Sequence, residues 1–417
     1  MLKVEKNLVN WIEKHLDIIF LICVTLAAVF VRFCIRKVES PDWISYLSLW
    51  FDAIKSGGGF RALSSTPANC DYNMLYQFLV AIMTYIPIEP LYQYKALSCL
   101  FDFVLAVFSA LIVYHVLGGE DKENTIEKRA RAKTGAILCY TCILFSLVVI
   151  MDSAAMAQCD AIYSAFVVAS LYFLLKDKYT PAFIMLGFAF AFKLQAMFIM
   201  PFYLFYWFYT KKFSLLYFLY IPLVMELAGL PCLLAGRPFL EVITGAFSIY
   251  FSQAGAKMGL YIEYPSFWAF MDVVPMAISG EYDYYRWQQL IMAFTVVVLA
   301  IVMYGFMKLK IKINQRNLLY IAFLLTYTTV LFLPNMMSRY GYLYLVLAIP
   351  LCFFNKKTIP WCVCIHMISI YMINNGCYSN LFPTTIQGIS LINLASWIAY
   401  MWILLKEIRA GQNEIIG

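Results

Sequence analysis

The sequence predicts an all-α polytopic membrane protein, and three observations support this class. Of its 417 residues, 63% are hydrophobic and only 13% are charged, and the mean hydropathy is +0.75, a balance that water-soluble domains do not show. Apolar runs recur along the whole chain at lengths near the ~20 residues that a helix needs to cross a bilayer. The runs are continuous rather than alternating, so they favour helices over the strands of a membrane barrel.

Taken in order, the apolar runs predict about twelve membrane-spanning helices in one domain, 1–417. The predicted spans are 17–35, 96–117, 135–150, 159–175, 181–192, 197–209, 214–234, 288–307, 317–333, 340–354, 358–374 and 388–405. Two shorter runs, 74–88 and 267–279, lie beside the longest polar loops, and we expect them to form re-entrant or half helices. The first run follows an amphipathic, charged N-terminus without a small-residue cleavage pattern, so we expect it to remain as an anchor.

The basic residues predict which ends of the helices face the cytoplasm. With the N-terminus inside, most of the 31 Lys and Arg residues fall at inner ends. If 74–88 crossed the membrane, the basic segment 118–134 would lie outside, so the charge pattern predicts that 74–88 does not cross. Two large extracytoplasmic loops follow, at 36–73 and 235–287. The net charge of +7 then reflects anchoring at the membrane and predicts no nucleic-acid partner.

Polar side chains collect in the loops at the predicted outer face. The first loop reads ESPDWISYLSLWFDAIKSGGGFRALSSTPANCDYN. The polar residues that we single out in this and later outer segments are Asp42, Asp52, Asp71, Asn73, Asp152, Gln158, Asp160, Lys193, Gln195, Arg237, Gln253, Arg339 and Tyr340. Polar groups at membrane depth are costly and usually face a cavity, so they predict a functional site on this face.

The residue types indicate the chemistry of that site. We expect Lys193, Arg237 and Arg339 to bind an anion, and guanidinium groups suit phosphate because their donors form a planar fork. A carboxylate beside them can act as a general base on an attacking hydroxyl. Together these groups fit a lipid-phosphate substrate, and transfer of a sugar from a polyprenyl phosphate needs such groups.

Two aspartates have simpler interpretations. Asp52, in WFDAIKSGG, is expected on an interfacial amphipathic helix that ends at the glycines, and Asp102, inside a span, is expected to pair with another helix. The three histidines have no metal-ligand spacing, and KSGGGF lacks the lysine and strand of a nucleotide-binding loop. Since the sequence also predicts no soluble domain of useful size, it leaves no place for an ATPase or a nucleotide-sugar-binding domain.

The order of the outer motifs resembles the integral-membrane glycosyltransferases of the GT-C superfamily, in particular the bacterial branch related to GPI mannosyltransferase II. The matching segments are SPDWISYLSLWFDAIKSGGGFRALSS with DYNMLYQFL, then DSAAMAQCDAIY, FKLQAMFIMP, GRPF, YFSQ and YPSFW, over 18–345. The resemblance implies a GT-C-like fold in a bacterial cytoplasmic membrane. It also implies that a hexose, as in a mannosyltransferase, passes with inversion from a polyprenyl-phosphate sugar to an extracytoplasmic glycan or lipid-linked acceptor.

Residue by residue, the resemblance makes Asp42 the candidate catalytic base. We expect Lys193 with Arg237 or Arg339 to bind the donor phosphate. The residues expected to bind sugar or acceptor hydroxyls are Asp71, Asn73, Asp152, Gln158, Asp160, Gln195, Gln253 and Tyr340. A divalent metal shared by Asp42 and Asp71 is compatible with the sequence, and no other cofactor is predicted.

The sequence departs from the family where the His-Glu-Arg-Tyr block reads MSRY, with Met337 and Ser338 in place of His and Glu. A divergent or inactive member is therefore one alternative. A lipid-linked polysaccharide flippase or transporter is another, but it predicts internal repeats and polar residues through both leaflets, which we do not find. A polysaccharide polymerase or ligase usually has a very large late loop, whereas 235–287 is moderate. The glycosyltransferase is the leading hypothesis.

Overall fold

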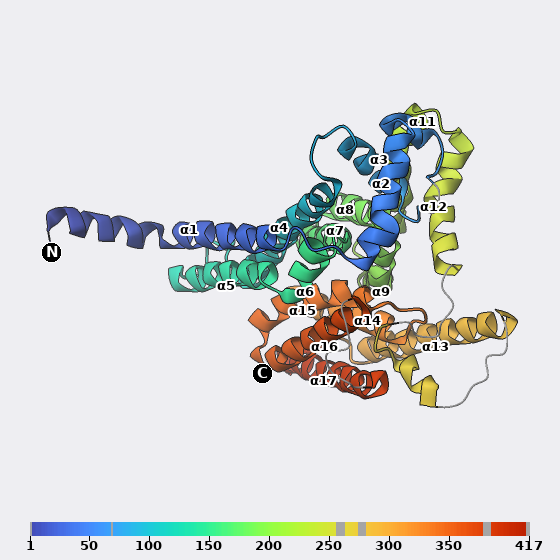
Figure 1. Ribbon diagram of the computed structural model, residues 1–417. Helices are drawn as coiled ribbons and strands as arrows, with labels where there is room; N and C mark the ends of the chain where they lie inside the picture. Colours follow the sequence, from blue (N-terminus) through green and yellow to red (C-terminus); the bar gives the residue numbers. More distant parts are fainter. Residues whose placement is uncertain (1, 68–69, 256–262, 274–280, 378–384, 414–417) are drawn as a thin grey trace.

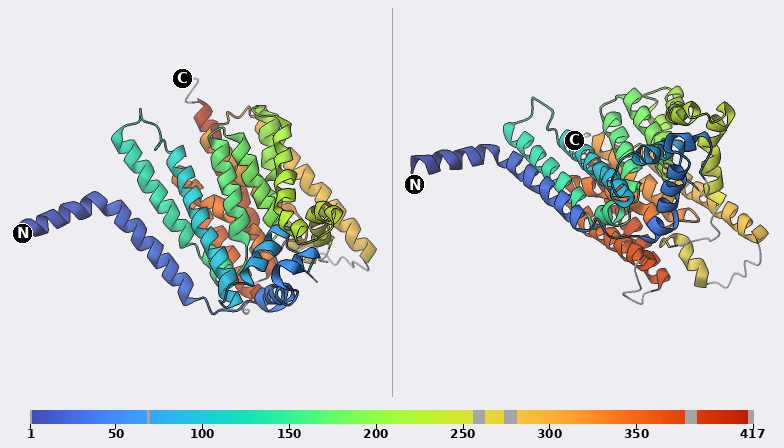
Figure 2. Two further views of the ribbon diagram at one scale, coloured as in Figure 1. Left: turned by 90° about the horizontal axis from the view of Figure 1, so that it is seen from above. Right: turned by 45° about the horizontal axis from the view of Figure 1, so that its top comes forward.

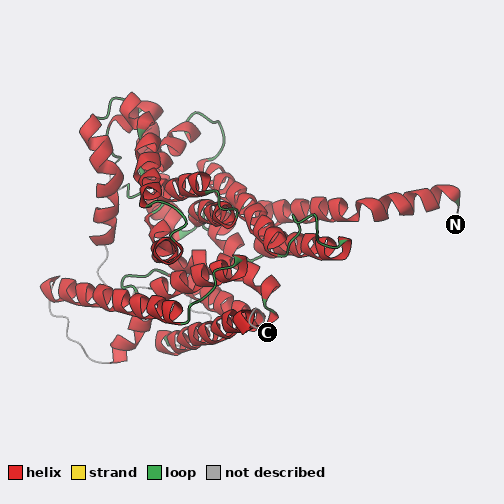
Figure 3. Cartoon of the chain, turned by 180° about the vertical axis from the view of Figure 1, so that it is seen from behind, coloured by secondary structure: helices red, strands yellow, loops and turns green. Residues whose placement is uncertain are grey.

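The computed structural model describes residues 2–67, 70–255, 263–273, 281–377 and 385–413. Within these ranges the chain forms helices and short 3-10 or π turns but no strand, which confirms the predicted all-α class (Figure 3). The long helices run alongside one another as a bundle, and the first loop lies at one end of it (Figure 2).

The N-terminal half of the chain forms a row of helices (Figure 1). In the order in which neighbours pack, the row consists of α1 (Lys3–Cys34), α5 (Ile126–Leu144), α4 (Pro90–Val116), α7 (Asp160–Leu175), α8 (Tyr179–Phe192) and α10 (Tyr220–Ala228). Shorter elements complete this half: α3 (Met74–Met83), α6 (Leu147–Ile150), the π turn η3 (Met151–Ala155), the 3-10 turn η4 (Leu194–Ile199), α9 (Met200–Thr210) and α11 (Leu230–Leu234).

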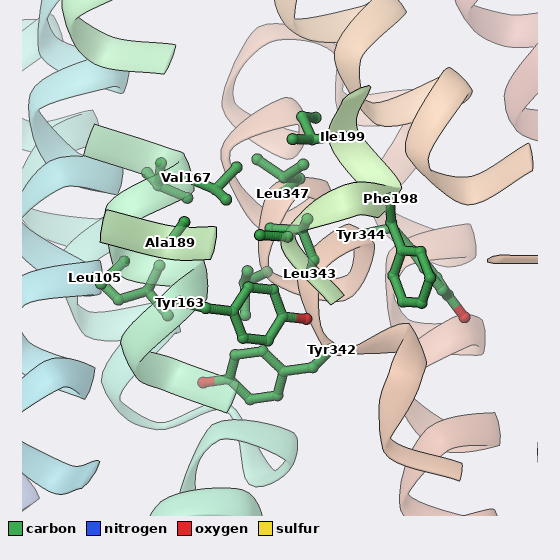
Figure 4. Packing of buried hydrophobic residues seen from close by; sticks show 14 of the residues in the cluster. Leu105, Tyr163, Val167, Ala189, Phe198, Ile199, Tyr342, Leu343, Tyr344 and Leu347 are labelled. Carbon is green, nitrogen blue, oxygen red and sulfur yellow. The ribbon is translucent and has the colours of Figure 1, made fainter. Parts of the chain in front are cut away.

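The C-terminal half packs against this row through two central helices. It consists of α13 (Glu281–Lys308), α14 (Gln315–Phe332), α15 (Tyr342–Phe354), α16 (Ile359–Cys377) and α17 (Ile386–Asn413). α14 and α15 are buried along most of their length, and α15 contacts α4, α5 and α7. Figure 4 shows Tyr342 and Leu343 of α15 beside Tyr163 of α7. Because lipid chains are as apolar as these side chains, close packing holds the halves together.

Five helices are long and apolar enough to cross a bilayer, judged by length and composition. They are Lys3–Cys34, Pro90–Val116, Leu215–Leu234, Tyr285–Lys308 and Ile386–Ala410. A sixth results if Ile126–Leu144 and Leu147–Ala155 are counted together, although the chain bends by 46° between them. The prediction of about twelve spans is therefore supported only in part, because α7, α8 and Ser338–Phe354 have 10–17 residues, fewer than the ~20 of a straight crossing.

Three predicted segments are refined by the structure. The run 74–88 forms only the 10-residue helix α3. The predicted loop 235–287 contains the 17-residue helix α12 (Phe239–Gly255), which the sequence analysis did not anticipate. The stretch FLEVITGAFSIY has apolar residues at helical spacing, which the surrounding polar residues obscured. Of the run 267–279, residues 267–273 form the 3-10 turn η6, and the rest lies outside the described residues.

The first loop is largely helical and turns sharply at its glycines. Its π turn η1 (Trp43–Leu47) leads into α2 (Ser48–Ser56), which ends at Gly57. Asp52 is exposed on this helix, as predicted. Gly58 and Gly59 have φ angles of 90° and 65°, which glycine adopts without steric strain. A Cβ on Gly59 would lie 2.5 Å from the hydroxyl of Tyr85, so the turn fits tightly beyond the end of α3.

A buried ion pair joins α1 to α4. Nε of Arg32 donates to Oδ2 of Asp102 at 2.8 Å, which confirms that Asp102 pairs with another helix. Nη2 of Arg32 donates to the carbonyl oxygen of Leu144 at 3.0 Å. Leu144 ends α5, so the guanidinium satisfies a carbonyl that the helix end leaves free. Ser153 of η3 donates to the same oxygen of Asp102 at 2.5 Å, and the pair thereby ties four elements together.

We expect Gly59→Ala to destabilise the protein, because a side chain there meets both an unfavourable φ and the Tyr85 hydroxyl. The expected loss is about 1–3 kcal/mol, measured as a lower midpoint of thermal unfolding in detergent. Gly305→Ala in α13 is the control, since no atom lies within 4 Å of its added Cβ. Equal destabilisation of the two variants would contradict this account of the turn.

Arg32→Met is expected to cost about 3–5 kcal/mol, because it leaves Asp102 buried without its counter-charge. Adding Asp102→Leu removes the second charge, so the double variant should recover much of that loss. Lys133→Met is the control, because Lys133 pairs with Asp17 at the surface and such pairs contribute about 0–1 kcal/mol. Denaturant unfolding measures all three. A double variant as unstable as Arg32→Met would show that packing, and not charge, dominates here.

Candidate functional site

A cavity of about 390 Å³ lies at the end of the bundle that carries the first loop. Its walls come from that loop, the turn before α7, the turn after α8, α13, and the segment 333–340. The polar and aromatic-hydroxyl side chains that line it are Asp42, Tyr46, Asp71, Tyr72, Gln158, Lys193, Gln195, Gln288, Asn335, Arg339 and Tyr340. Segments far apart in the sequence thus place acids, cations and amides around one space.

A capped helix start in the first loop positions Asp42. The hydroxyl of Ser40 accepts a hydrogen bond from the backbone N–H of Trp43 at 3.1 Å and donates to the carbonyl of Met156 at 3.0 Å. Ser40 therefore caps the helix and also anchors the loop to the bundle. Pro41 suits the first helical position because its φ is already fixed. Asp42 follows in the first turn, where the helix dipole favours its negative charge.

Gln158 connects Asp42 to the aromatic part of the wall. Its Nε2 donates to Oδ2 of Asp42 at 2.8 Å, and its Oε1 accepts from the hydroxyl of Tyr72 at 3.0 Å. Burial raises the pKa of Tyr72 well above its ordinary value, so the phenol keeps the proton that it donates. The preceding residue, Ala157, has a φ of 58°, which is uncommon for a residue with a Cβ. This turn directs the Gln158 side chain towards the cavity.

Two cations face the acids. Lys193 follows the end of α8 and Asp160 begins α7, so each charge has the sign that its helix end favours. Their Nζ and Oδ1 atoms are 2.8 Å apart and almost fully buried. Nη2 of Arg339 lies 2.8 Å from Oδ2 of Asp42, and its Nη1 lies 3.7 Å from Oδ2 of Asp160. Arg339 therefore links the loop acid to the buried pair.

The charge on Lys193 is secured by its neighbours. Burial alone disfavours an ammonium ion, but the carboxylate of Asp160 outweighs that effect and raises the pKa of Lys193. Its Nζ also lies 5.8 Å from the centre of the Tyr72 ring, within the range of a cation–π contact. Since Lys193 and Arg339 both line the cavity, an entering anion meets two permanent positive charges.

The rest of the cavity wall is apolar. Its side chains are Leu47, Trp50, Leu194, Met197, Phe198, Met292, Leu333, Pro334, Met336 and Met337. Met197 and Met292 are about half exposed, at 52% and 48%, so this wall continues onto the outer surface of the bundle. Trp50 packs edge-to-face on Tyr72 with ring centres 4.9 Å apart. A bound molecule would thus meet both charged and apolar side chains.

The predicted hydroxyl-binding residues divide into four groups. Those that line the cavity are Asp71, Gln158, Gln195 and Tyr340. Asn73 instead caps α3, where it accepts from the N–H of Met74 and donates to the carbonyl of Ala246. Asp152 and Asp160 are buried behind the wall, and the side chain of Gln253 lies outside the described residues.

The structure does not bring Arg237 to the cavity. Its side chain is 2% exposed, and its guanidinium donates to the carbonyl oxygens of Leu63 and Ser65. It also donates to Oε1 of Gln77 at 3.2 Å. Arg237 therefore clamps the end of the first loop to α3, and the cations available for an anion in the cavity are Lys193 and Arg339.

Sequence reasoning missed several residues of the wall, among them Tyr46, Trp50, Tyr72, Gln288 and Asn335. Tyr46 and Trp50 are one helical turn apart in the first loop, which is a signal for a shared face. Tyr72 lies between two residues that the sequence did single out. Gln288 comes from α13, and no local pattern marks it.

Metal binding was tested against the residues present. In the described part of the chain, no group of three or more His, Cys, Asp or Glu side chains is arranged to hold a metal ion. Asp42 and Asp71 both line the cavity, but Oδ2 of Asp42 is already occupied by donors from Gln158 and Arg339. A metal held by these two carboxylates is therefore not supported by this geometry.

No protein-family model matches this chain, and a search of curated proteins finds no significant match. The geometry of the cavity therefore carries the functional argument.

Arg237→Lys is expected to lower stability by about 2–5 kcal/mol, because an ammonium group cannot reach all the acceptors of the planar guanidinium. Thermal unfolding in detergent measures this. Arg61→Lys in the same loop is the control, since Arg61 is exposed and its replacement should be nearly neutral. If Arg237→Lys left stability unchanged, the clamp would have no energetic importance.

Proposed function

We propose that the protein is an inverting glycosyltransferase of the GT-C type that uses a polyprenyl-phosphate sugar. The observation that carries the proposal is that the Asp42 carboxylate shares one cavity with Lys193 and Arg339, next to an apolar wall. A base for an acceptor hydroxyl, positive charge for a leaving phosphate and a surface for a lipid chain are the parts that this reaction needs.

The donor phosphate is assigned to Lys193 and Arg339. Both face the cavity and both are permanently charged. Arg339 presents a planar fork that matches two phosphate oxygens, and Lys193 adds a point charge. In the absence of donor, Asp42 and Asp160 occupy these cations. The charge that develops on the departing phosphate oxygen would then meet groups that are already in position.

Asp42 is assigned as the general base. In the described residues its contacts with Gln158 and Arg339 both fall on Oδ2, which leaves Oδ1 for the acceptor. Oδ1 takes the hydroxyl proton as the acceptor oxygen attacks the anomeric carbon. The bond from that carbon to the phosphate oxygen breaks on the opposite face, and polyprenyl phosphate leaves with the electron pair. A single displacement of this kind inverts the anomeric centre.

The hydrocarbon of the donor is assigned to the apolar wall. This wall reaches the surface at Met197 and Met292, so a prenyl chain would enter from the side rather than through the loops. The same proposal places the cavity on the extracytoplasmic face of a bacterial cytoplasmic membrane. It also counts the shorter apolar helices as additional spans, for about twelve in total. The acceptor, a glycan or a lipid-linked saccharide, would approach past Asp71 and Tyr46 of the first loop.

We expect Asp42→Asn to reduce sugar transfer by roughly 10²–10⁴-fold, because an amide cannot accept the hydroxyl proton. The assay incubates purified protein with radiolabelled polyprenyl-phosphate mannose, glucose and galactose in separate reactions and measures the lipid phosphate released. Asp52→Asn is the matched control: it lies in the same loop, is exposed, and should retain near-normal transfer. Near-normal turnover by a folded Asp42→Asn variant would exclude Asp42 as the base.

A further inference from the structure

The buried carboxyl group of Asp152 has no part in the transfer described above. It lies on η3 with 1% of its surface exposed. Neither of its oxygens accepts a hydrogen bond from a donor in the described part of the chain, and the same is true of Oδ2 of Asp160. A buried carboxylate without donors is costly, so these three oxygens require an explanation.

η3 packs against α7, and the side chains of Asp152 and Asp160 interact across this contact. Ionised carboxylates only accept hydrogen bonds, and a protonated one supplies a donor. A contact between two carboxyl groups therefore needs one proton between them. With that proton in place, an oxygen of Asp152 and an oxygen of Asp160 that lack other donors are joined by a hydrogen bond.

The charge balance around Asp152 and Asp160 also indicates that the two carboxyl groups share one proton. Lys193 and Arg339 are the cations of this region, and Asp160 and Asp42 already neutralise them. The other ionisable groups close by in the described residues are Asp102, which Arg32 neutralises, and the neutral side chains of Tyr76, Tyr163, Tyr342 and Cys159. A charge on Asp152 would be a third carboxylate against two cations, in a buried site where an uncompensated charge is strongly unfavourable.

We propose that Asp152 is a neutral carboxylic acid that donates its proton to Asp160, so that the two form one acid pair with a single negative charge opposite Lys193. Asp152 is then a positioning residue. Its hydrogen bond draws negative charge on Asp160 away from Lys193, and this leaves the ammonium group better able to hold an anion in the cavity. Only this last consequence rests on the proposed glycosyltransferase function.

The proton itself is tested by infrared spectroscopy on the purified full-length protein without substrate. At about pH 7.5 ordinary carboxyl groups are ionised, so a protonated acid stands out by its C=O stretch above the amide band. We expect such a band in the unaltered protein, its loss in Asp152→Asn and its retention in Asp42→Asn. The absence of any band that Asp152→Asn removes would overturn the proposal. The proposal would also be overturned if the band were absent and the stability of the protein depended on added Na⁺. A bound cation, and not a proton, would then bridge the two carboxylates.

Two matched variants test which member of the pair carries the charge. Asp152→Asn keeps the size of a neutral acid and a donor towards Asp160, so we expect the equilibrium constant of unfolding to change less than about tenfold. Asp160→Asn leaves Lys193 without its counter-charge, so we expect a shift of roughly two orders of magnitude or more towards the unfolded state. Equal shifts in the two variants would overturn the assignment.

The lipid-phosphate release assay separates this inference from the proposed function. Asp152→Asn should retain transfer within about tenfold, whereas Asp160→Asn should lose most of it. If no donor is turned over by the unaltered protein, the proposed function fails, and the infrared band and the unfolding data still decide the acid pair. If transfer occurs and the band is missing, the acid pair fails while the enzyme assignment stands.

Discussion

Charges buried in a helix bundle must meet opposite charges at short distance, and this constraint fixes how the helices of this protein come together. Arg32 and Asp102 tie α1, α4, α5 and η3 at one place. Lys193, Asp160 and Arg339 tie α7, the end of α8 and the start of α15 at another. Breaking such a pair leaves an uncompensated charge. Each pair therefore determines which helices pack together and also stabilises their packing.

The short segment η3 belongs to both clusters. Ser153 donates to Asp102, while the preceding residue, Asp152, contacts Asp160. Two residues beside the cavity, Ala157 and Asn335, have uncommon backbone conformations, with φ angles of 58° and 60°. Such conformations cost of order 1–3 kcal/mol each and persist where the surrounding contacts enforce them. The position of Gln158 thus depends on the charge clusters behind it.

The sequence was informative wherever a local rule applied. The glycines after Asp52 predict the end of a helix, and α2 ends at Gly57. No local rule predicts long-range pairing. From the sequence alone Arg237 was expected to bind phosphate, but its partners are backbone carbonyls about 170 residues away along the chain. Asp152 stands in a polar motif and is buried all the same, because the π turn directs it inward. The number of spans is supported only in part, because hydropathy marks apolar runs but does not reveal where a helix ends.

The pairing of Arg32 has a consequence for the order of assembly in the membrane. Arg32 is synthesised 70 residues before Asp102 and 112 residues before Leu144. When α1 first enters the bilayer, its guanidinium has neither partner, and a long side chain near a helix end can reach the headgroups in the meantime. α1 can dock at this site only once α4 and α5 are in place, because they supply the partners of Arg32. The buried arginine therefore makes the docking of the first helix depend on two helices that follow it in the chain.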